Sequence, residues 1–402
     1  MKIFFITTYN ARNVKNWSGI PYYLANGFIE AGIEVEFIDN LQSLPGNYFT
    51  FRVRNLIYNR LLKKKLGEYR SFYEPANLKF IASQVIEKIN KMEGGIVFSP
   101  GTIPIAYLTT DKPIAFWTDA TFAVMENYYQ DFNGLCKRTV KNCHSYERNA
   151  LRRSSLSIYS SEWAANSAMK DYDTDPKKVK VIPFGSNIDL KTTESDIELN
   201  NNKKSRSICK LLFIGQNWER KGGEAAIRVA KYLNENYIKT ELTIVGCTPA
   251  ESKNLPDFVH TLGFVDKSKN EGKNLIHQLY FENHFFILPT TAECTPIVFS
   301  EANSFGLPVI TTSTGGIPSI IRNDVNGRMF GNEIDIPVCA KYIYEIFDDY
   351  ERYKKFSLAS FNECMTRLNW HVSISKCISY MQGLEKSNEK TQHTRLQQCD
   401  PF

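Results

Sequence analysis

The sequence predicts an α/β protein built of two Rossmann-like domains, each with a parallel sheet covered by helices. Short runs of β-branched and aromatic residues alternate with helical segments, which is the pattern of βαβ units. This pattern occurs in both halves of the chain. In addition, 402 residues are more than one hydrophobic core usually accommodates, and 43% apolar residues are enough to fill two cores.

The first half opens with the apolar run KIFFIT (2–7) and a helical segment from Pro21 to Ala31. Apolar runs without polar alternation are typical of strands that are buried on both faces of a parallel sheet. By this criterion we expect further strands at VEFID (35–39), IVFS (96–99), PIAFWT (113–118) and SLSIYS (155–160). We place the first domain at residues 1–188.

The second half repeats the plan. Its expected strands are KLLFIG (210–215), ELTIVG (241–246), VHTLGFV (259–265), FFILP (285–289) and VITT (309–312). The polar stretch before them is predicted to be an exposed linker. The sequence therefore predicts a linker at 189–207, a second domain at 208–370, a helix at 371–385 that packs back on the first domain, and a mobile tail at 386–402. The linker and this helix are the expected hinge.

Charge and cysteine usage exclude some classes of function. The formal charge of +6 is modest for this length, so we expect no nucleic-acid partner. Nine cysteines are scattered without a C-x-x-C pair, as in a reduced, cytoplasmic protein. The N-terminal apolar run spans five residues, too few for a signal peptide, and no stretch has the ~18–20 apolar residues that cross a bilayer.

Two glutamates, Glu293 and Glu301, lie between the strand runs FFILP and LPVITT. The loop that carries Glu293 leaves the carboxyl end of a strand, where ligands bind in open α/β sheets. Thr295 and Pro296 precede a predicted helix, whose first N–H groups suit a phosphate. The simpler alternatives are an exposed loop acid for Glu293 and a first-turn acid facing the helix dipole for Glu301. The acid and nucleophile of a glycoside hydrolase are a further alternative for the pair.

A second loop, FIGQNWERKGG (213–223), follows the first strand of the second half. Gly215 ends the strand, and Arg220 and Lys221 stand just before a glycine-rich helix start. Such a helix N-terminus with two adjacent cations attracts phosphate oxygens. The alternative is a solvated turn.

Taken together, F-I-G-x-x-W-x-R-K-G-G, E-x7-E and A-x-x-x-G-L-P-V-I-T-T-x-x-G-G resemble the family-4 retaining glycosyltransferases. The likeness is close over most of residues 208–330 and extends through the chain in outline. It implies the GT-B fold, in which two Rossmann-like domains face each other across a cleft. It also implies an enzyme that moves a sugar from a nucleotide-diphosphate sugar to an acceptor hydroxyl with retention, without metal or cofactor, in the biosynthesis of a polysaccharide, lipopolysaccharide or glycolipid.

The resemblance implies a role for each matching residue. Arg220 and Lys221 would contact the diphosphate and stabilise the charge of the leaving nucleotide. Glu301 would accept hydrogen bonds from the ribose hydroxyls, and Glu293 would face the transferred sugar. Gly215 and the backbone of Thr295, Pro296 and Ile297 would lie against the donor.

The first domain would supply the acceptor side. Its loop TYNARNVKNWSGI (8–20) resembles the glycine loop that approaches the donor in this family, with Gly19 as the candidate residue. Asp119 occupies the place where many relatives carry a histidine that touches the sugar. An ionised Asp accepts hydrogen bonds but cannot donate them, so a sugar-binding or acceptor-orienting role and a plain turn both remain open. His144, on a predicted helix, is interpreted as structural.

Two other segments bear on partners. Asp173 and Asp175 match a D-x-D metal motif but precede Pro176, so we interpret them as a helix-ending turn and expect no metal ligand. The segment 51–73 carries seven Lys or Arg residues among Leu, Ile and Tyr. Such a helix either rests on an anionic membrane or packs on the first domain with a solvated basic face. A lipid-linked acceptor and a peripheral place at the inner face of a membrane would fit the first alternative.

Two other functions remain open at this stage. A non-catalytic scaffold subunit that binds sugar nucleotides would keep the same donor site. A non-hydrolysing sugar-nucleotide epimerase shares the two-domain fold and would need no acceptor.

Overall fold

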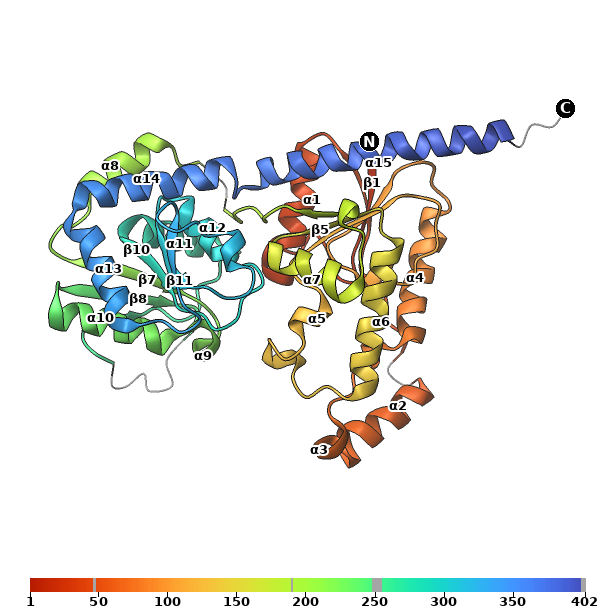
Figure 1. The fold of residues 1–402 in the computed structure, drawn as a ribbon, viewed down its shortest axis with the longest axis horizontal. Coiled ribbons are helices and arrows are strands. Elements are labelled where there is room, and N and C mark those ends of the chain that lie inside the picture. The colour runs from red at the N-terminus through yellow and green to blue at the C-terminus, as the bar shows by residue number, and fades with distance from the viewer. Residues whose placement is uncertain (46–47, 189–190, 248–254, 399–402) are drawn as a thin grey trace. The chain divides into compact units, whose positions relative to one another are not determined.

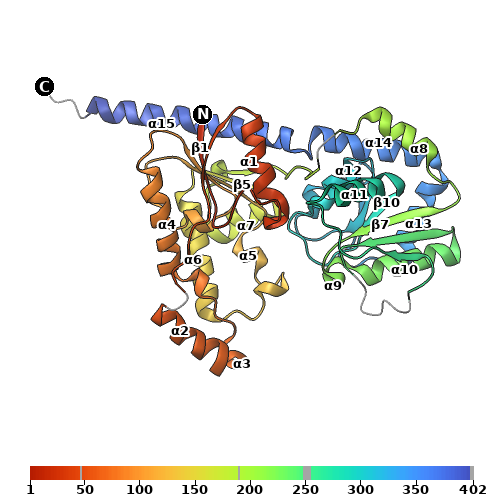
Figure 2. The same cartoon turned by 180° about the vertical axis from the view of Figure 1, so that it is seen from behind.

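The structure is a computed structural model that describes residues 1–45, 48–188, 191–247 and 255–398, with side chains as far as Leu384. By internal contacts the chain forms two compact units (Figures 1 and 2). Unit 1 comprises Met1–Ile182 and Ser373–Phe402, and unit 2 comprises Pro183–Val372.

Unit 1 contains a six-stranded parallel sheet with the strand order β2-β1-β3-β4-β5-β6. The central strands are buried on both faces, which confirms the prediction made from their continuous apolar runs. The strands are β1 (Lys2–Ile6), β2 (Glu34–Ile38), β3 (Ile96–Ser99), β4 (Ile114–Thr118), β5 (Leu156–Tyr159) and β6 (Val179–Val181).

Helices connect these strands, as the right-handed crossovers of a parallel sheet require. Apolar side chains of α4, α6 and α7 share one buried cluster with the strands. The helices of unit 1 are α1 (Ile20–Glu30), α2 (Phe49–Asn55), α3 (Lys63–Leu66), α4 (Pro75–Ile89), α5 (Phe122–Met125), α6 (Lys137–Arg153) and α7 (Glu162–Tyr172). The last helix of the chain, α15 (Trp370–Gln398), joins unit 1 from Ser373 onward. It lies close to α1, because a Cβ on Gly27 would come within 2.8 Å of Ile374 Cγ1.

Unit 2 repeats the architecture with the strand order β12-β11-β10-β7-β8-β9, again all parallel. From β7 the chain adds β8 and β9 on one side, and then returns to add β10, β11 and β12 on the other. The order therefore reverses between β7 and β10. The strands are β7 (Cys209–Ile214), β8 (Thr240–Val245), β9 (Val259–Thr261), β10 (Phe285–Leu288), β11 (Val309–Thr312) and β12 (Gly327–Phe330).

The helices of unit 2 include α10, which packs against α13, and α8, which lies beside α14 in both Figure 1 and Figure 2. They are α8 (Glu194–Lys203), α9 (Trp218–Lys221), α10 (Gly223–Asn236), α11 (Asn270–Glu282), α12 (Ile297–Asn303), α13 (Ile336–Asp348) and α14 (Tyr350–Thr366). One apolar core joins these helices to the sheet.

The prediction that residues 189–207 form an exposed linker is wrong. Residues 189–190 lie outside the described part, but the rest of the segment contains α8. A capping box between Thr193 and Asp196 starts this helix. Ile197 is fully buried, and Asn201 Nδ2 donates to Ser357 Oγ of α14 at 2.9 Å. The polar composition concealed this one buried face. The chain instead passes between the units at Ile182/Pro183 and Val372/Ser373.

Two predicted helices also differ from the structure. The helix expected at 371–385 runs from Trp370 to Gln398, so much of the predicted tail is helical, while 399–402 lie outside the described part. The segment 51–73 is divided into α2, a π-helical turn at Leu56–Leu61, α3 and a short 3-10 turn. Gly67 ends α3 with φ +83°, a conformation that suits glycine and that stops the helix.

Among the described residues, no helix is both long enough and apolar enough to cross a membrane.

Candidate donor site in unit 2

The predicted site residues of the second half gather where the strand order of unit 2 reverses. Strands β7 and β10 are paired there, with Leu211 beside Phe285. The turn after β7 carries Arg220 and Lys221, and the loop after β10 carries Glu293. Ligands of doubly wound sheets bind at the carboxyl ends of the strands at such a reversal.

The turn after β7 is shaped by glycine. Gly222 has φ +75°, and a Cβ there would lie 2.0 Å from the carbonyl oxygen of Pro289 in the loop after β10. No other residue fits this position without moving one of the loops. The short helix α9 precedes it, and the side chain of Asn217 caps that helix by accepting from Arg220 N at 2.8 Å. The close approach brings the side chains of Arg220 and Lys221 to the β10 loop.

Arg220, Lys221 and Glu293 form one charged cluster. Arg220 Nη1 donates to Glu293 Oε1 at 2.9 Å and to the carbonyl oxygen of Ala292 at 2.7 Å. Lys221 Nζ donates to the same carboxylate oxygen. Glu293 is 6% exposed, whereas the side chains of Arg220 and Lys221 keep 27% and 13% of their surface accessible. Two cations and one carboxylate leave one net positive charge at the sheet edge.

The loop after β10 is fixed to both of its neighbours. Thr291 N donates to the carbonyl oxygen of Arg220 at 2.8 Å, and Thr290 Oγ1 donates to the same oxygen at 2.9 Å. On the other side, Gly316 N donates to the carbonyl oxygen of Glu293 at 3.0 Å. The backbone on either side of the acidic side chain is thus held in place. Preorganisation of this kind is what an anion-binding site needs.

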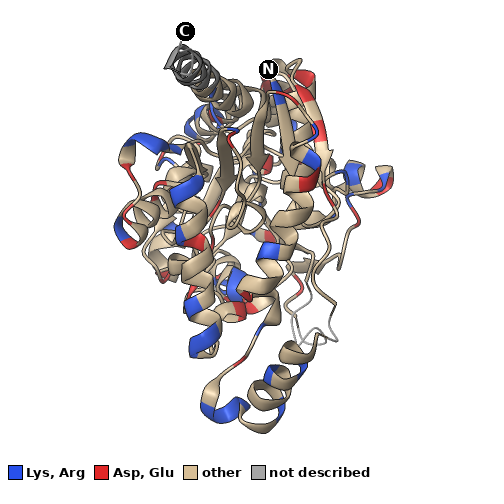
Figure 3. Ribbon diagram, turned by 90° about the vertical axis from the view of Figure 1, so that its right-hand side faces the viewer, with Lys and Arg blue, Asp and Glu red and all other residues tan. Residues whose placement is uncertain are grey.

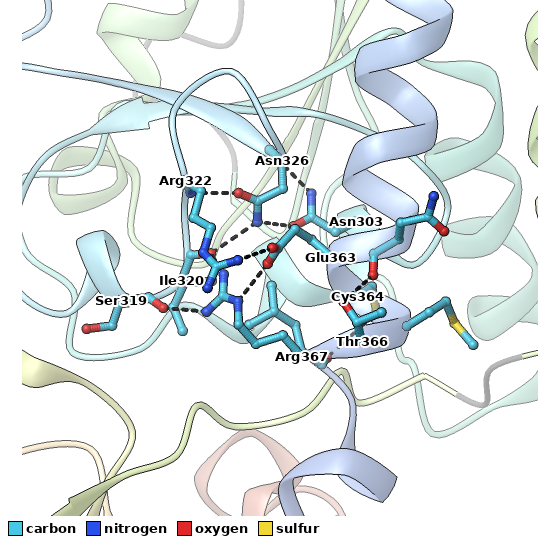
Figure 4. A network of polar contacts seen from close by, with 12 residues as sticks. Asn303, Ser319, Ile320, Arg322, Asn326, Glu363, Cys364, Thr366 and Arg367 are labelled. Carbon is cyan, nitrogen blue, oxygen red and sulfur yellow. Dashed lines mark hydrogen bonds and ion pairs between the residues drawn. The ribbon is translucent and has the colours of Figure 1, made fainter.

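The segment after β11 that carries Gly316 is anchored by a polar network (Figure 4). Glu363 of α14 accepts from Arg322 Nη1 at 2.5 Å and from Arg367 Nε at 2.6 Å. Asn326 Nδ2 donates to Asn303 Oδ1 of α12 at 2.8 Å. Arg367 also donates to the carbonyl oxygens of Ser319 and Ile320. The network ties the turn before β12 to α12 and α14, and thereby supports the loop beside Glu293.

Glu301 lies on α12, is 1% exposed, and already has strong partners. Lys267 Nζ donates to its two carboxylate oxygens at 2.7 and 2.6 Å, and the Tyr280 hydroxyl donates to Oε2 at 3.0 Å. Burial, together with this carboxylate, raises the pKa of Tyr280 well above its ordinary value, so the phenol remains a donor. Because α12 begins at Ile297 and has no acid in its first turn, the helix-dipole alternative for Glu301 is wrong.

Sequence reasoning missed Lys267 and Tyr280. Lys267 lies in the loop after β9, within the polar run DKSKN, and nothing in that run distinguishes it from its neighbours. Tyr280 lies on α11 at a position that resembles any core aromatic of an amphipathic helix. A buried carboxylate requires such partners, so the need for a cation near Glu301 is the one signal that the sequence offered.

The remaining residues proposed for the donor lie along the same edge. Pro296 is the N-cap of α12 and Ile297 is its first residue, and no side chain caps this helix start. Thr295 directly precedes them. A Cβ on Gly215 would approach Lys221 Cγ to 2.9 Å, so the absence of a side chain there makes room for the lysine stem.

In unit 1, the loop after β1 has an unusual backbone. Trp17, Ser18 and Gly19 have φ values of +42°, +55° and +85° in succession, directly before α1. Non-glycine residues rarely adopt this region, and when they do they often belong to functional loops. The predicted glycine loop therefore has a conformation that local propensity does not explain.

Asp119 follows β4, on the carboxyl edge of the sheet in unit 1. Burial and the negative charge of Asp119 raise the pKa of Tyr9, a residue of the loop after β1. Gly19 and Asp119 thus both lie in loops that follow strands of the parallel sheet of unit 1.

The side chains that the sequence interpreted as structural have local partners. His144 on α6 lies 3.0 Å from the Tyr172 hydroxyl through Nδ1 and 3.1 Å from Glu126 Oε2 through Nε2. Asp173 ends α7 in the left-handed region with φ +53°, and the side chain of Asp175 accepts from Lys177 N. The D-x-D motif therefore forms a turn between α7 and β6.

Parts of the chain are similar in sequence to known proteins. Residues 194–362 match the family model of glycosyl transferases group 1. An uncharacterized glycosyltransferase of Methanocaldococcus jannaschii is 30% identical over 206 residues, which cover 48% of this chain and 51% of that protein. The UDP-Gal:alpha-D-GlcNAc-diphosphoundecaprenol alpha-1,3-galactosyltransferase of Escherichia coli is 26% identical over 176 residues, which cover 42% of this chain and 45% of that protein. The matches thus span about half the length of these relatives.

Among solved structures, sucrose-phosphate synthase from Thermosynechococcus elongatus superposes with a TM-score of 0.69 at 14% identity, covering 96% of this chain and 99% of that one. At this identity the likeness concerns the fold. The chain therefore has the GT-B fold, and its residues 194–362 are similar to the glycosyl transferases group 1.

Proposed function

We propose that this chain is a glycosyltransferase that moves a sugar from a nucleotide-diphosphate sugar to an acceptor hydroxyl, with retention of configuration. The observation that carries the proposal is the cluster of Arg220, Lys221 and Glu293 at the strand-order reversal of unit 2. It combines one net positive charge with a fixed backbone at the edge where doubly wound sheets bind ligands.

The cluster suits a leaving diphosphate. An Arg guanidinium holds phosphate oxygens with its planar fork, and a Lys ammonium adds a compact charge. As the bond between the sugar and the diphosphate breaks, negative charge grows on the phosphate, and these two cations stabilise it. Charge stabilisation by groups that are already in place is a large part of enzymatic rate enhancement.

Retention follows if the departing phosphate oxygen takes the proton of the acceptor hydroxyl. The acceptor oxygen then bonds to the anomeric carbon on the face from which the phosphate leaves. No side chain has to act as nucleophile in this scheme. Glu293 positions the two cations and accepts hydrogen bonds from the transferred sugar, so catalysis consists of positioning and electrostatics.

Glu301 is proposed to bind the ribose. A carboxylate can accept from both hydroxyls of a ribose, and Lys267 and Tyr280 hold this one in a fixed orientation. Thr295, Pro296 and Ile297 would then lie against the phosphate or the sugar. On unit 1, Gly19 and Asp119 remain our candidates for donor approach and acceptor orientation.

The relatives suggest where to look for substrates. The E. coli protein is named for transfer from UDP-Gal to a sugar on diphosphoundecaprenol. We propose a uridine-diphosphate hexose as donor and a lipid-linked glycan as acceptor. We also propose that the reaction needs no metal, since Arg220 and Lys221 supply the positive charge that a divalent ion supplies elsewhere.

The test is a transfer assay with UDP-glucose and UDP-galactose against detergent-solubilised polyprenyl-diphosphate sugars, with and without chelator. We expect transfer in the presence of chelator and a product whose anomeric proton coupling shows the configuration of the donor. Isomerised donor formed without acceptor would instead identify an epimerase. Nucleotide binding without any turnover would identify a scaffold, and activity restored only by manganese would contradict metal independence.

A further inference from the structure

The segment 48–66 of unit 1 exposes an unusual amount of apolar surface. Among the described residues, 19 large hydrophobic side chains are exposed, and eight of them fall within these 19 positions. Phe49 and Leu61 are the most exposed of the eight, at 77% and 67%. The eight are Tyr48, Phe49, Val53, Leu56, Ile57, Leu61, Leu62 and Leu66. Such a concentration of exposed apolar side chains in one short segment indicates an interaction site rather than chance exposure.

All charged residues of the same segment are basic. It contains six Lys or Arg residues and no Asp or Glu. Figure 3 shows this at the lower end of unit 1, where α2 and α3 carry Lys and Arg between uncharged residues. Within the described part of the chain, Arg54 is the one of these six that forms an ion pair, with Glu74 at 3.0 Å. Lys63, Lys64 and Lys65 are exposed and follow one another in α3.

The segment is nevertheless held firmly in unit 1 by its other side. Phe51 is buried, and Asn59 exchanges two hydrogen bonds with the backbone of Tyr69, each at 2.8 Å. Glu74, which pairs with Arg54, is itself held by Arg138 at 2.6 Å. Figures 1 and 2 both show α2 and α3 at one end of unit 1, beyond α4 and α6. A fixed underside therefore presents the apolar and basic side chains outward.

We propose that residues 48–66 dock unit 1 onto an anionic lipid surface, with Phe49 and Leu61 inserted among the acyl chains and the basic residues at the headgroups. Interleaved apolar and basic residues are the composition of interfacial segments. Nucleic acid would engage the charges but not the exposed aliphatic side chains. A second copy of the chain would have to place this uniformly basic surface against itself, because a two-fold contact pairs the same patch on both partners.

The test uses the full chain and sedimentation with vesicles of phosphatidylcholine, alone or mixed with phosphatidylglycerol. We expect binding to the mixed vesicles that weakens at high salt, because screening reduces the attraction between exposed charges. A Lys63→Gln, Lys64→Gln, Lys65→Gln variant should partition about 100-fold more weakly, since each basic residue near such a surface contributes about a factor of five. A Phe49→Ser, Leu61→Ser variant should lose roughly tenfold or more.

Matched controls come from unit 2. Leu199 and Val338 are 58% and 54% exposed, and Leu199→Ser, Val338→Ser should leave vesicle binding unchanged. Lys231, Lys239 and Lys341 are exposed, and their change to Gln removes the same charge as the α3 variant. Circular dichroism melting of each variant shows that it is folded.

Several outcomes would overturn the proposal. Equal binding to neutral and anionic vesicles would do so, as would equal losses in the segment variants and their controls. A dimer in analytical ultracentrifugation that Phe49→Ser, Leu61→Ser abolishes, without any vesicle binding, would reassign the surface to a second copy of the chain.

Discussion

Replacing Glu293 by Gln separates its proposed role as a sugar contact from a role in phosphate binding. The substitution keeps the size and one acceptor oxygen but removes the charge that Arg220 and Lys221 share. The net charge of the cluster then rises from one to two. A phosphate group entering the site would meet more positive charge and one less carboxylate.

The expected loss of stability follows from the burial of the three groups. Removing one partner of a buried ion pair costs about 3–5 kcal/mol. The side chains of Arg220 and Lys221 are 27% and 13% exposed, so water stabilises part of the unpaired charge, and the Gln oxygen still accepts a hydrogen bond. We therefore expect the free energy of unfolding to fall by about 2 kcal/mol, which corresponds to roughly 4–8 °C in melting temperature for a unit of this size.

The assay compares UDP binding by calorimetry with sugar transfer by the same variant. UDP affinity should stay equal or rise several-fold, because repulsion of the phosphates is removed, while transfer should fall at least about tenfold, since each tenfold corresponds to about 1.4 kcal/mol of lost sugar contact. Glu293→Asp restores the negative charge on a side chain that is one methylene shorter. This variant should recover more of the lost stability than of the lost transfer activity. If UDP affinity fell in parallel with transfer, the assignment of Glu293 to the sugar would be refuted.

Four other substitutions provide tests. Arg220→Ala should lower kcat about 100-fold or more, as loss of one charge-stabilising donor does elsewhere, while the melting temperature falls by no more than the few degrees expected for Glu293→Gln, because Lys221 still pairs with Glu293; unfolding instead would mark Arg220 as structural. Glu301→Gln should weaken UDP binding by about 1–3 kcal/mol. Tyr280→Phe removes one hydrogen bond to the same carboxylate and should affect stability more than UDP affinity. Equal UDP affinities of the wild type and these two variants would exclude the ribose role. Burial raises the pKa of Glu147 in unit 1 from 4.5 to about 8, against an opposing hydrogen bond from Thr102. Between about pH 4.5 and 8 the folded chain thus keeps a proton on Glu147 that the unfolded chain loses. The free energy of unfolding should therefore fall over this range and then level off. A Glu147→Gln variant that shows the same decline would refute the assignment of this pH dependence to Glu147.

The sequence predicted the structure best where a residue pattern is compatible with few conformations. Continuous apolar runs located the strands to within a residue or two, because a strand buried on both faces permits little else. Three strands depart from this: β6 and β12 were not predicted from apolar runs, and β9, predicted to reach 265, ends at Thr261 since Gly263 at φ +63° leaves the extended conformation. The R-K-G-G turn was predictable for a similar reason, because no residue type other than glycine fits at position 222 against the carbonyl oxygen of Pro289.

Features that depend on contacts distant in sequence were beyond prediction. Helix α8 appeared to be a linker because a single buried face, centred on Ile197, is too weak a pattern to detect. Lys267 and Tyr280 reach Glu301 from the loop after β9 and from α11, and no local pattern records that convergence. The exposed apolar face of 48–66 was also hidden, because composition alone does not show which side of a segment is buried.

The measurement closest to the central claim is calorimetric titration of UDP into the wild-type chain and an Arg220→Ala, Lys221→Ala variant. The account predicts saturable UDP binding to the wild type, together with a stabilisation of about 2.7 kcal/mol at 100 times the dissociation constant. The folded double variant should bind at least about 100-fold more weakly, as expected from the loss of two charge-assisted phosphate contacts. Equal UDP affinity for the two proteins, or no binding of any nucleoside diphosphate by the wild type, would contradict the claim that this cluster holds the donor.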